Sequence, residues 1–418
     1  MVHCQGWNHN MTFSRWISSK SYTTSRALCD PTIYSAPSAA RATTTKSTAE
    51  PNLDKPVKVF IWMGQSNMLK TMTTDLIRGD KGSDITYRQS LLEDTIQSKK
   101  RFVHLYNSTS GGWSAYQNVR HVAFDSNGVL NQNEFLGEYK EQPASVRTRK
   151  GRPKQQKEDW GTIGPELQFG YVLSQIMGDS PILLLKSCAE NRSLGWDWLP
   201  PGSKQYQHDG YVYAGSGESP ERWKIHQPTN TKTKSQQSWH AGKQYEIDVA
   251  NARHVLNNIQ DYYPGLKHKR YEIEGFVWWQ GTQDLDFPGW VHRYERNLVN
   301  LIVRLRRDFQ VPRAKVAIAT IGGLQNTTKA ESAVFQAQMA VGGGGGGSGE
   351  RGGKYPAFLG NVHTVDIRSS WEESSKDIVP KKNNNPVEYF QRHAETCLET
   401  GNALGWAMAK LLYQNQQN

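Results

Sequence analysis

The sequence has few cysteines, no long apolar run and, in its first 29 residues, no acidic side chain. Its four cysteines lie far apart, and neither a CxxC pair nor a Cys/His spacing typical of zinc sites occurs. We therefore expect free thiols, with no disulfide framework, structural metal or cofactor. No stretch reaches the roughly 18 apolar residues that a membrane-spanning helix needs, so we expect no membrane span.

The lack of acidic residues in 1–29 accompanies three basic residues, Arg15, Lys20 and Arg26, in a stretch rich in serine and threonine. This composition is typical of an organelle transit peptide, but a disordered tail without an address has it too. No apolar segment of the length needed in a secretory signal occurs there. The localisation stays open between an organelle, the cytoplasm and secretion by a signal that is not evident.

The chain of 418 residues is only 36% hydrophobic, and its mean hydropathy of −0.71 is low for a globular enzyme. These values favour one large domain with polar insertions and tails. We place the domain at residues 55–413, after a tail at 1–54 and before a tail at 414–418. Its two insertions are a basic one at about 139–158 and a glycine-rich one at 342–353.

The net charge of +11 raises the question of nucleic-acid binding. Six basic residues cluster in RTRKGRPKQQK (147–157), where neither a recognition motif nor interleaved aromatic residues accompany them. This favours a solvated surface insertion and no nucleic-acid partner, while an attraction for acidic sugars remains open. The stretch GGGGGGSGERGG is equally typical of a loop insertion and of an engineered linker.

The segment VKVFIWMGQSN (57–67) is the stretch around which the rest is organised. Its apolar run predicts a buried parallel strand that Gly64 ends. Ser66 then follows at the carboxyl end of the strand, where ligands bind in open α/β sheets. Ser66 is the candidate nucleophile; the alternative is an ordinary turn after a strand.

Apolar runs predict four further strands, and helical periodicity separates most of them. Alternating strands and helices predict an α/β fold with a parallel sheet and helices on both faces. The four strands are expected at 182–186, 275–279, 315–320 and 362–366, and the helices begin near Leu167, span 249–259 and 298–305, and end the chain at 394–412.

Five sequence blocks together resemble the SGNH hydrolases, in the branch of the sialate O-acetylesterases and related acetylxylan esterases. The blocks are GQSN, GPELQFG (164–170), NRSLGWDWLPPGS (191–203), YEIEGFVWWQG (271–281) and HAETCLETGNALGWAM (393–408). The resemblance spans roughly residues 55–412. It implies a three-layer, flavodoxin-like α/β/α fold with a five-stranded parallel sheet, and hydrolysis of acetyl esters on sugars.

The resemblance also implies site residues. Ser66 is the nucleophile, and its N–H, Asn191 and Gln280 hold the oxyanion of the tetrahedral intermediate. For Gln280 the alternative is a structural hydrogen bond in a loop. Substrate contacts are expected from the neighbours of Ser66 and from aromatic residues of the other blocks, although tryptophans there are at least as often core residues. These residues are Gln65, Asn67, Trp196, Trp198, Trp279 and Tyr389.

The sequence departs from the family at the acid and at the base. Asp284 is the carboxylate expected nearest the site, with surface helix capping as its alternative and Asp366 as another acidic candidate. Relatives open the last block with a histidine, but here Tyr389 takes that position and His393 follows four residues later. Tyrosine, with a pKa near about 10, is a poor base at neutral pH.

Two functions therefore remain open from the sequence. One is a serine acetylesterase acting on acetylated carbohydrate with His393 as base. The other is a catalytically impaired SGNH-fold protein that binds carbohydrate. The oligomeric state has no sequence signal.

Overall fold

The computed structural model describes residues 50–68, 72–73, 77–78, 84–85, 101–107, 109, 112–125, 127–138, 162–226, 238–322, 328–343, 354–370 and 394–413. Residues 1–49 of the predicted N-terminal tail, the C-terminal tail, the basic insertion and residues 344–353 of the glycine-rich stretch lie outside these ranges, as do Tyr389 and His393. Within them, no helix is long and apolar enough to cross a membrane. Cys188 and Cys397 are buried free thiols.

A seven-stranded sheet forms the centre of the molecule, in the spatial order β16-β15-β14-β1-β10-β7-β8. All neighbouring pairs are parallel except β7 and β8, which are antiparallel. The strands are β1 (Val57–Gly64), β7 (Tyr116–Phe124), β8 (Leu130–Leu136), β10 (Ile182–Cys188), β14 (Tyr271–Trp279), β15 (Lys315–Ala319) and β16 (Val362–Val365).

The five predicted strands are all present and parallel. Numbered along the chain, β1, β10, β14, β15 and β16 have the spatial order 2-1-3-4-5, which is the flavodoxin-like order. The chain therefore reverses its direction of winding beside β1, at the point where α/β proteins bind ligands.

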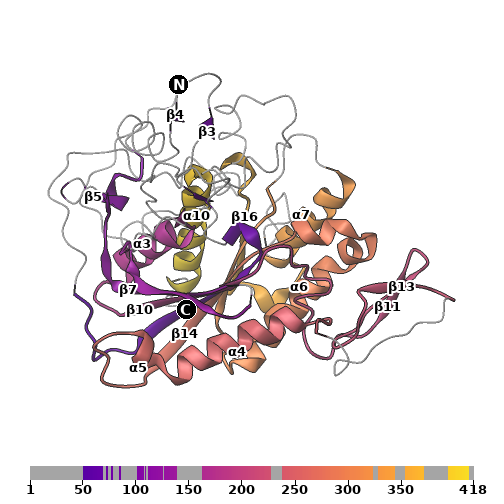
Figure 1. Cartoon of the computed structure of the whole chain (residues 1–418), viewed down its shortest axis with the longest axis horizontal. Helices are drawn as coiled ribbons and strands as arrows, with labels where there is room; N and C mark the ends of the chain where they lie inside the picture. Colours follow the sequence, from indigo (N-terminus) through magenta and orange to yellow (C-terminus); the bar gives the residue numbers. More distant parts are fainter. Residues whose placement is uncertain are drawn as a thin grey trace, which may run out of the picture.

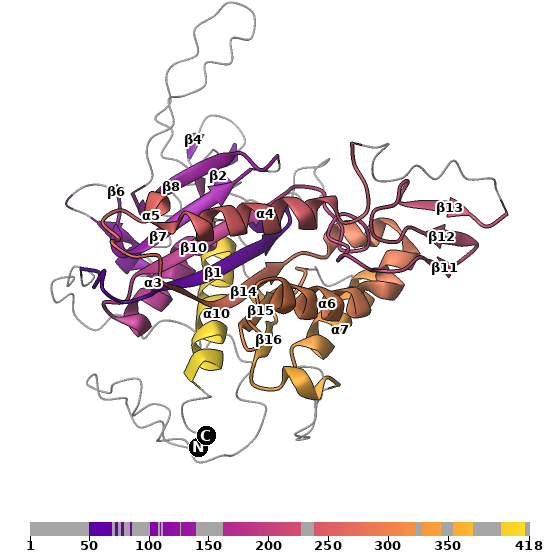
Figure 2. The same cartoon turned by 90° about the horizontal axis from the view of Figure 1, so that it is seen from below.

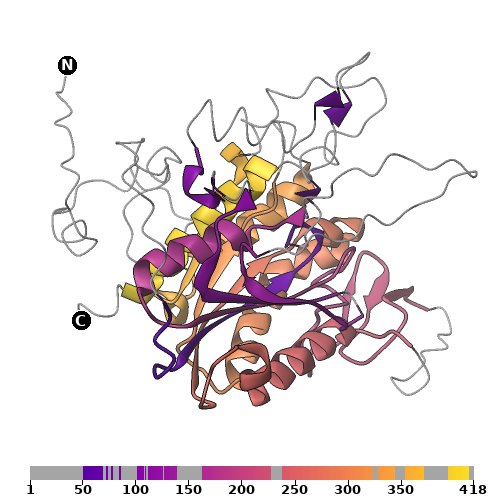
Figure 3. The same cartoon turned by 60° about the vertical axis from the view of Figure 1, so that its left-hand side comes forward.

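The predicted strand count of five was wrong, because β7 and β8 extend the sheet beyond β10. Figure 3 brings this edge of the sheet forward. Both strands were missed because they are rich in polar residues. Arg120, for example, is buried on β7, where its Nε donates to Asn133 Oδ1 on β8 (2.9 Å) and to Tyr262 O (3.0 Å). Polar residues such as these break the apolar run that identifies a buried strand.

Helices cover both faces of the sheet (Figures 1 and 2). Alternation along β1 decides which side chains face which helices. Val59, Ile61 and Met63 pack in the cluster that contains α4, α6 and α7 residues, while Phe60 and Trp62 face α3 and α10. The helices are α3 (Glu166–Met177), α4 (Lys243–Asn257), α5 (Ile259–Tyr262), α6 (Pro288–Asp308), α7 (Lys329–Val341) and α10 (Ala394–Tyr413). The three-layer α/β/α prediction is confirmed.

A small antiparallel sheet lies at one side of the molecule (Figure 2). It consists of β11 (Tyr206–His208), β12 (Tyr211–Tyr213) and β13 (Arg222–Lys224), and it packs through Tyr213 on Trp196 and Trp290. The remaining strands are two-residue pairs, and four 3₁₀ helices complete the described elements. These are β2 (Met72–Thr73), β3 (Ile77–Arg78), β4 (Asp84–Ile85), β5 (Tyr106–Asn107), β6 (Gly112–Trp113), β9 (Thr162–Ile163), η2 (Ser66–Met68), η4 (Val103–Leu105), η6 (Thr282–Asp286) and η7 (Pro356–Phe358).

Candidate active site

Ser66 begins a single 3₁₀ turn, η2, directly after the central strand β1. The turn stays close to the neighbouring strand β14 because Gln65 N donates to Trp279 O (3.2 Å). A Cβ at Gly64 would lie 2.4 Å from Trp279 O and 2.5 Å from Met68 Sδ, so only glycine fits there. The glycine of the GQSN block thus lets the end of β1 lie this close to β14 and Met68, and Ser66 itself is partly exposed.

Gln65 joins this turn to the WWQG block. Its buried side chain accepts a hydrogen bond through Oε1 from Gly281 N (3.0 Å). The contact fixes the start of η2 against the end of β14. The side chain of Gln65, which was predicted to contact substrate, therefore makes a contact that supports the turn. For Asn67, the structure describes the backbone, which belongs to η2.

The loop after β10 begins beside the same turn, where Ala189 N donates to Gly64 O (3.2 Å). Asn191 lies two residues further on with φ 53°, in the left-handed region, and its side chain is exposed. Asparagine tolerates this conformation better than most residues that carry a Cβ.

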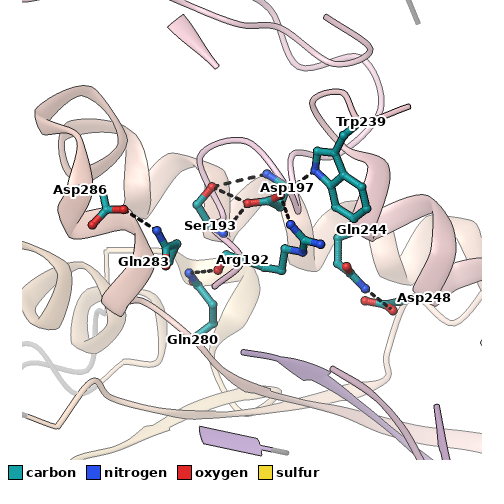
Figure 4. A network of polar contacts seen from close by, with 9 residues as sticks. All are labelled: Arg192, Ser193, Asp197, Trp239, Gln244, Asp248, Gln280, Gln283 and Asp286. Atoms are coloured by element: carbon teal, nitrogen blue, oxygen red, sulfur yellow. Dashed lines mark hydrogen bonds and ion pairs between the residues drawn. The ribbon is translucent and has the colours of Figure 1, made fainter. Parts of the chain in front are cut away.

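Gln280 is fully buried and holds the Asn191 loop to β14. Its Nε2 donates to Arg192 O (3.0 Å, Figure 4) and to Asp284 Oδ2 (2.6 Å). On the other side, Tyr294 OH donates to Gln280 O (2.7 Å), which also accepts from Gln338 Nε2 (2.8 Å). Because a side-chain amide has two N–H donors, both hydrogens of Gln280 are engaged in this arrangement.

Asp284 lies under the same loop, in η6. One carboxylate oxygen accepts from Leu194 N and the other from Gly195 N, each at 2.8 Å. Burial raises the pKa of Asp284 to about 7, and the hydrogen bonds from Gln280, Leu194 and Gly195 oppose this rise only in part. The surface-capping alternative for Asp284 was wrong, because the side chain is fully buried and its partners belong to another segment. Asp366, the other acidic candidate, is exposed and pairs with Arg368.

Sequence reasoning missed a second buried carboxylate in this loop, Asp197. It accepts from Ser193 N (2.8 Å) and Ser193 Oγ (3.1 Å) through Oδ2, and from Trp239 Nε1 (2.8 Å) through Oδ1. The guanidinium of Arg192 stacks over the Trp239 ring at 3.8 Å (Figure 4). An acid between two tryptophans in GWDW was the available signal, because a charged residue in an apolar run needs buried partners.

The tryptophans predicted as sugar contacts lie in the core. Trp198 and Trp279 are at most 1% exposed, and Trp279 Nε1 donates to Thr320 O (3.1 Å). Trp196 is 9% exposed and packs in the cluster beside the small sheet. Their ring faces are covered by protein, which supports the core interpretation of these three residues.

No group of three or more His, Cys, Asp or Glu side chains in the described part of the chain could hold a metal ion. What the described residues assemble is a partly exposed serine beside a loop whose backbone amides are fixed by two buried carboxylates. Such an arrangement can place N–H groups where an oxyanion develops.

Known proteins provide an independent comparison. Residues 214–342 match the family model described as carbohydrate esterase, sialic acid-specific acetylesterase. This range contains Gln280 and Asp284 but neither Ser66 nor the Asn191 loop. No curated protein matches the chain.

Three solved structures have low similarity to it. They are a protein from Arabidopsis thaliana (17% identity, 85% of this chain and 98% of that chain, TM-score 0.43), NanS (14%, 77% and 79%, TM-score 0.40) and a carbohydrate acetylesterase from Xanthomonas citri (12%, 85% and 57%, TM-score 0.40). At these TM-scores the likenesses support no conclusion about this chain. The family match confirms the resemblance recognised in the sequence, and it is residues 214–342 that are similar to the sialic acid-specific acetylesterases among the carbohydrate esterases.

Proposed function

We propose that this protein is a serine esterase that removes O-acetyl groups from sugars, of the sialate or xylan type. The observation that carries the proposal is the contact of the GQSN turn with the WWQG block, in which Gly281 N donates to Gln65 Oε1. It brings the candidate nucleophile of one block beside the buried network of the other. The family match adds the substrate class, an acetylated carbohydrate.

In the proposed reaction, Ser66 Oγ attacks the acetyl carbonyl carbon while a base takes the Ser66 proton. The negative charge on the carbonyl oxygen is held by the backbone N–H groups of Ser66 and Asn191. The sugar hydroxyl leaves with a proton and an acetyl-Ser66 intermediate remains. Water then hydrolyses this ester to acetate and restores the serine.

Gln280 has a supporting role in this proposal. Its two N–H groups are committed to Arg192 O and Asp284, so it acts by fixing the backbone next to Asn191. Asp284 acts on the same loop through the Leu194 and Gly195 amides. Together they hold the amides in place before the substrate arrives, which is what an oxyanion site requires.

The base is His393 in this proposal. His393→Ala should then lower acetyl-ester turnover by several orders of magnitude, as the loss of a triad member does. Turnover of p-nitrophenyl acetate and of an acetylated sugar, compared between wild type, Ser66→Ala and His393→Ala, tests this. Robust turnover that survives both substitutions would refute the assignment, including the nucleophile.

A second candidate function is a carbohydrate-binding protein with impaired chemistry. The observation that favours it is Tyr389, which stands where relatives have the base histidine. In that case wild-type turnover is marginal, and Tyr389→His raises it by roughly 10²-fold, the usual scale of a positioned general base. If Tyr389→His leaves a slow wild type unchanged, the missing histidine does not explain the slowness.

A further inference from the structure

A buried ion pair lies beneath the turn that carries Ser66. Lys186 Nζ lies 2.9 Å from Glu166 Oε2, and the two side chains are 3% and 0% exposed. The same ammonium donates to Met68 O at 2.5 Å. Met68 is the last residue of η2, and Ser66 is the first.

The fold directs both charged side chains to this place. Lys186 is on β10 opposite Trp62 of β1, two residues before that strand ends at Gly64. Glu166 is the first residue of α3, and its carboxylate occupies the space beside Gly164, where a Cβ would lie 2.1 Å from Glu166 Oε2. A glycine at 164 is therefore needed for Glu166 to reach Lys186.

Helix α10 packs closely against the start of α3, beside Glu166. A Cβ at Gly401 would lie 2.1 Å from Pro165 O, so α10 and the start of α3 can approach this closely only with glycine at 401. The blocks GPELQFG and HAETCLETG thus meet behind the nucleophile turn. The proposed catalytic residues include none from GPELQFG, and the pairing of Glu166 with Lys186 gives that block a function.

Stability alone does not account for a buried Lys–Glu pair. Removing two charges from water is expensive, and well-packed apolar residues of similar volume are often as stable or more so. By contrast, η2 needs external support. It is a single 3₁₀ turn closed by the Met68 N to Gln65 O bond (2.9 Å), and bonds of this type have poor geometry.

We propose that Lys186, oriented by Glu166, is a positioning residue that sets the place of Ser66. The turn is held at both ends: Gln65 Oε1 accepts from Gly281 N at its start, and Met68 O accepts from Lys186 Nζ at its end. This role rests on the proposed function only because the proposed esterase reaction is what the fixed serine would perform. The hydrogen bond from Lys186 to Met68 O fixes the backbone of η2 whether or not the protein is an esterase.

The test uses Lys186→Met and Glu166→Gln with Lys315→Met as matched control. Lys315 is also a buried lysine on a parallel strand, and its Nζ donates to Gly360 O (3.4 Å). It is the first residue of β15, so it lies at the amino ends of the parallel strands, whereas Ser66 follows the carboxyl end of β1. We expect Lys186→Met to lower kcat for an acetyl ester by about 10²-fold, the usual effect of a misplacement of about 1 Å, with KM nearly unchanged. Lys315→Met should leave kcat unchanged.

The pair should act as one unit, so the double variant Lys186→Met/Glu166→Gln should lose little more than the stronger single variant. Hydrogen exchange provides a readout that needs no turnover. The amide of Met68 should exchange roughly tenfold faster or more in Lys186→Met and at the wild-type rate in Lys315→Met. If Lys186→Met does not fold, Glu166→Gln, which keeps the side-chain volume, carries the same expectations.

Wild-type kcat and wild-type exchange at residues 65–68 in a folded Lys186→Met or Glu166→Gln variant would overturn the inference. So would a loss of kcat matched by Lys315→Met, since that would reflect general destabilisation. A wild-type protein without any esterase turnover would refute the proposed function instead. The exchange experiment then still decides whether Lys186 holds the turn.

Discussion

Replacing Asp284 by alanine tests how the loop beside Ser66 is built. The carboxylate accepts hydrogen bonds from three buried donors: Leu194 N, Gly195 N and Gln280 Nε2. Each buried donor left without a partner costs about 1–3 kcal/mol, so the gross loss of folding stability is about 3–9 kcal/mol. A substitution that removes so many buried contacts at once belongs to the most destabilising class.

The pKa of Asp284 adds a pH dependence with a definite sign. The difference between its ordinary pKa of 3.8 and about 7 in the folded protein corresponds to about 4 kcal/mol. Between these values the folded state binds more protons than the unfolded state, so this group makes wild-type stability fall as pH rises from about 4 to about 7. Asp284→Ala removes this dependence. Its stability deficit should therefore be larger at pH 5 than at pH 8.

Urea unfolding followed by tryptophan fluorescence at pH 5 and pH 8 measures both effects. Asp286→Asn is the matched control, because Asp286 belongs to the same η6 but is exposed. The control should change stability by less than about 0.5 kcal/mol. An Asp284→Ala variant as stable as the control, or a deficit that grows towards pH 8, would refute the interpretation of Asp284 as the buried support of the loop.

Three further substitutions have distinct expectations. Asn191→Gly should raise the unfolding free energy by up to about 1 kcal/mol, because the backbone at φ 53° suits glycine. It should keep turnover, because the proposed donor is the backbone N–H of residue 191. A loss of turnover above tenfold would assign the donor role to the side chain instead. Tyr294→Phe should lower the unfolding free energy by about 0.5–1.5 kcal/mol, since Gln280 O loses its 2.7 Å donor but keeps Gln338 Nε2, and an unchanged denaturation midpoint would contradict this. Thr328→Ala should lower the unfolding free energy by about 1 kcal/mol, because it removes the capping box that Thr328 forms with Glu331 at the start of α7. Turnover should stay at the wild-type level.

Five of the parallel strands were predictable from the sequence because they are apolar and largely buried on both faces. Such strands have continuous apolar runs, as Val57–Trp62 and Ile182–Lys186 do, and each run lies within a strand of the sheet. The strands β7 and β8, which extend the sheet beyond β10, were not predictable in this way. Their polar side chains find partners across the strand pair, as Arg120 and Asn133 do, and this pairing is not visible in a single sequence.

The site was predictable where a motif identifies a strand end, and less so where a partner is distant in the chain. Ser66 and Gln280 follow strands that are neighbours in the sheet, as expected. The roles of Asp284 and Lys186 depend on Leu194 and Glu166, which are separated from them by 90 and 20 residues. Periodicity and propensity carry no information about such contacts.

The tryptophans illustrate a different difficulty. A tryptophan after a strand is equally suited to stack on a sugar and to fill a core, and the sequence pattern is the same for both. Packing decides between them: Trp198 lies edge-to-face against Trp278, with ring centroids 5.2 Å apart, and is fully buried.

The central claim is that Ser66 becomes acetylated during turnover. The most direct measurement is peptide mass spectrometry of enzyme that is quenched in acid during hydrolysis of an activated acetyl ester. We expect an acetyl group on the peptide that contains Ser66, absent from Ser66→Ala and from denatured wild type. Turnover with the acetyl group on another residue, or equal labelling of the Ser66→Ala protein, would contradict the claim.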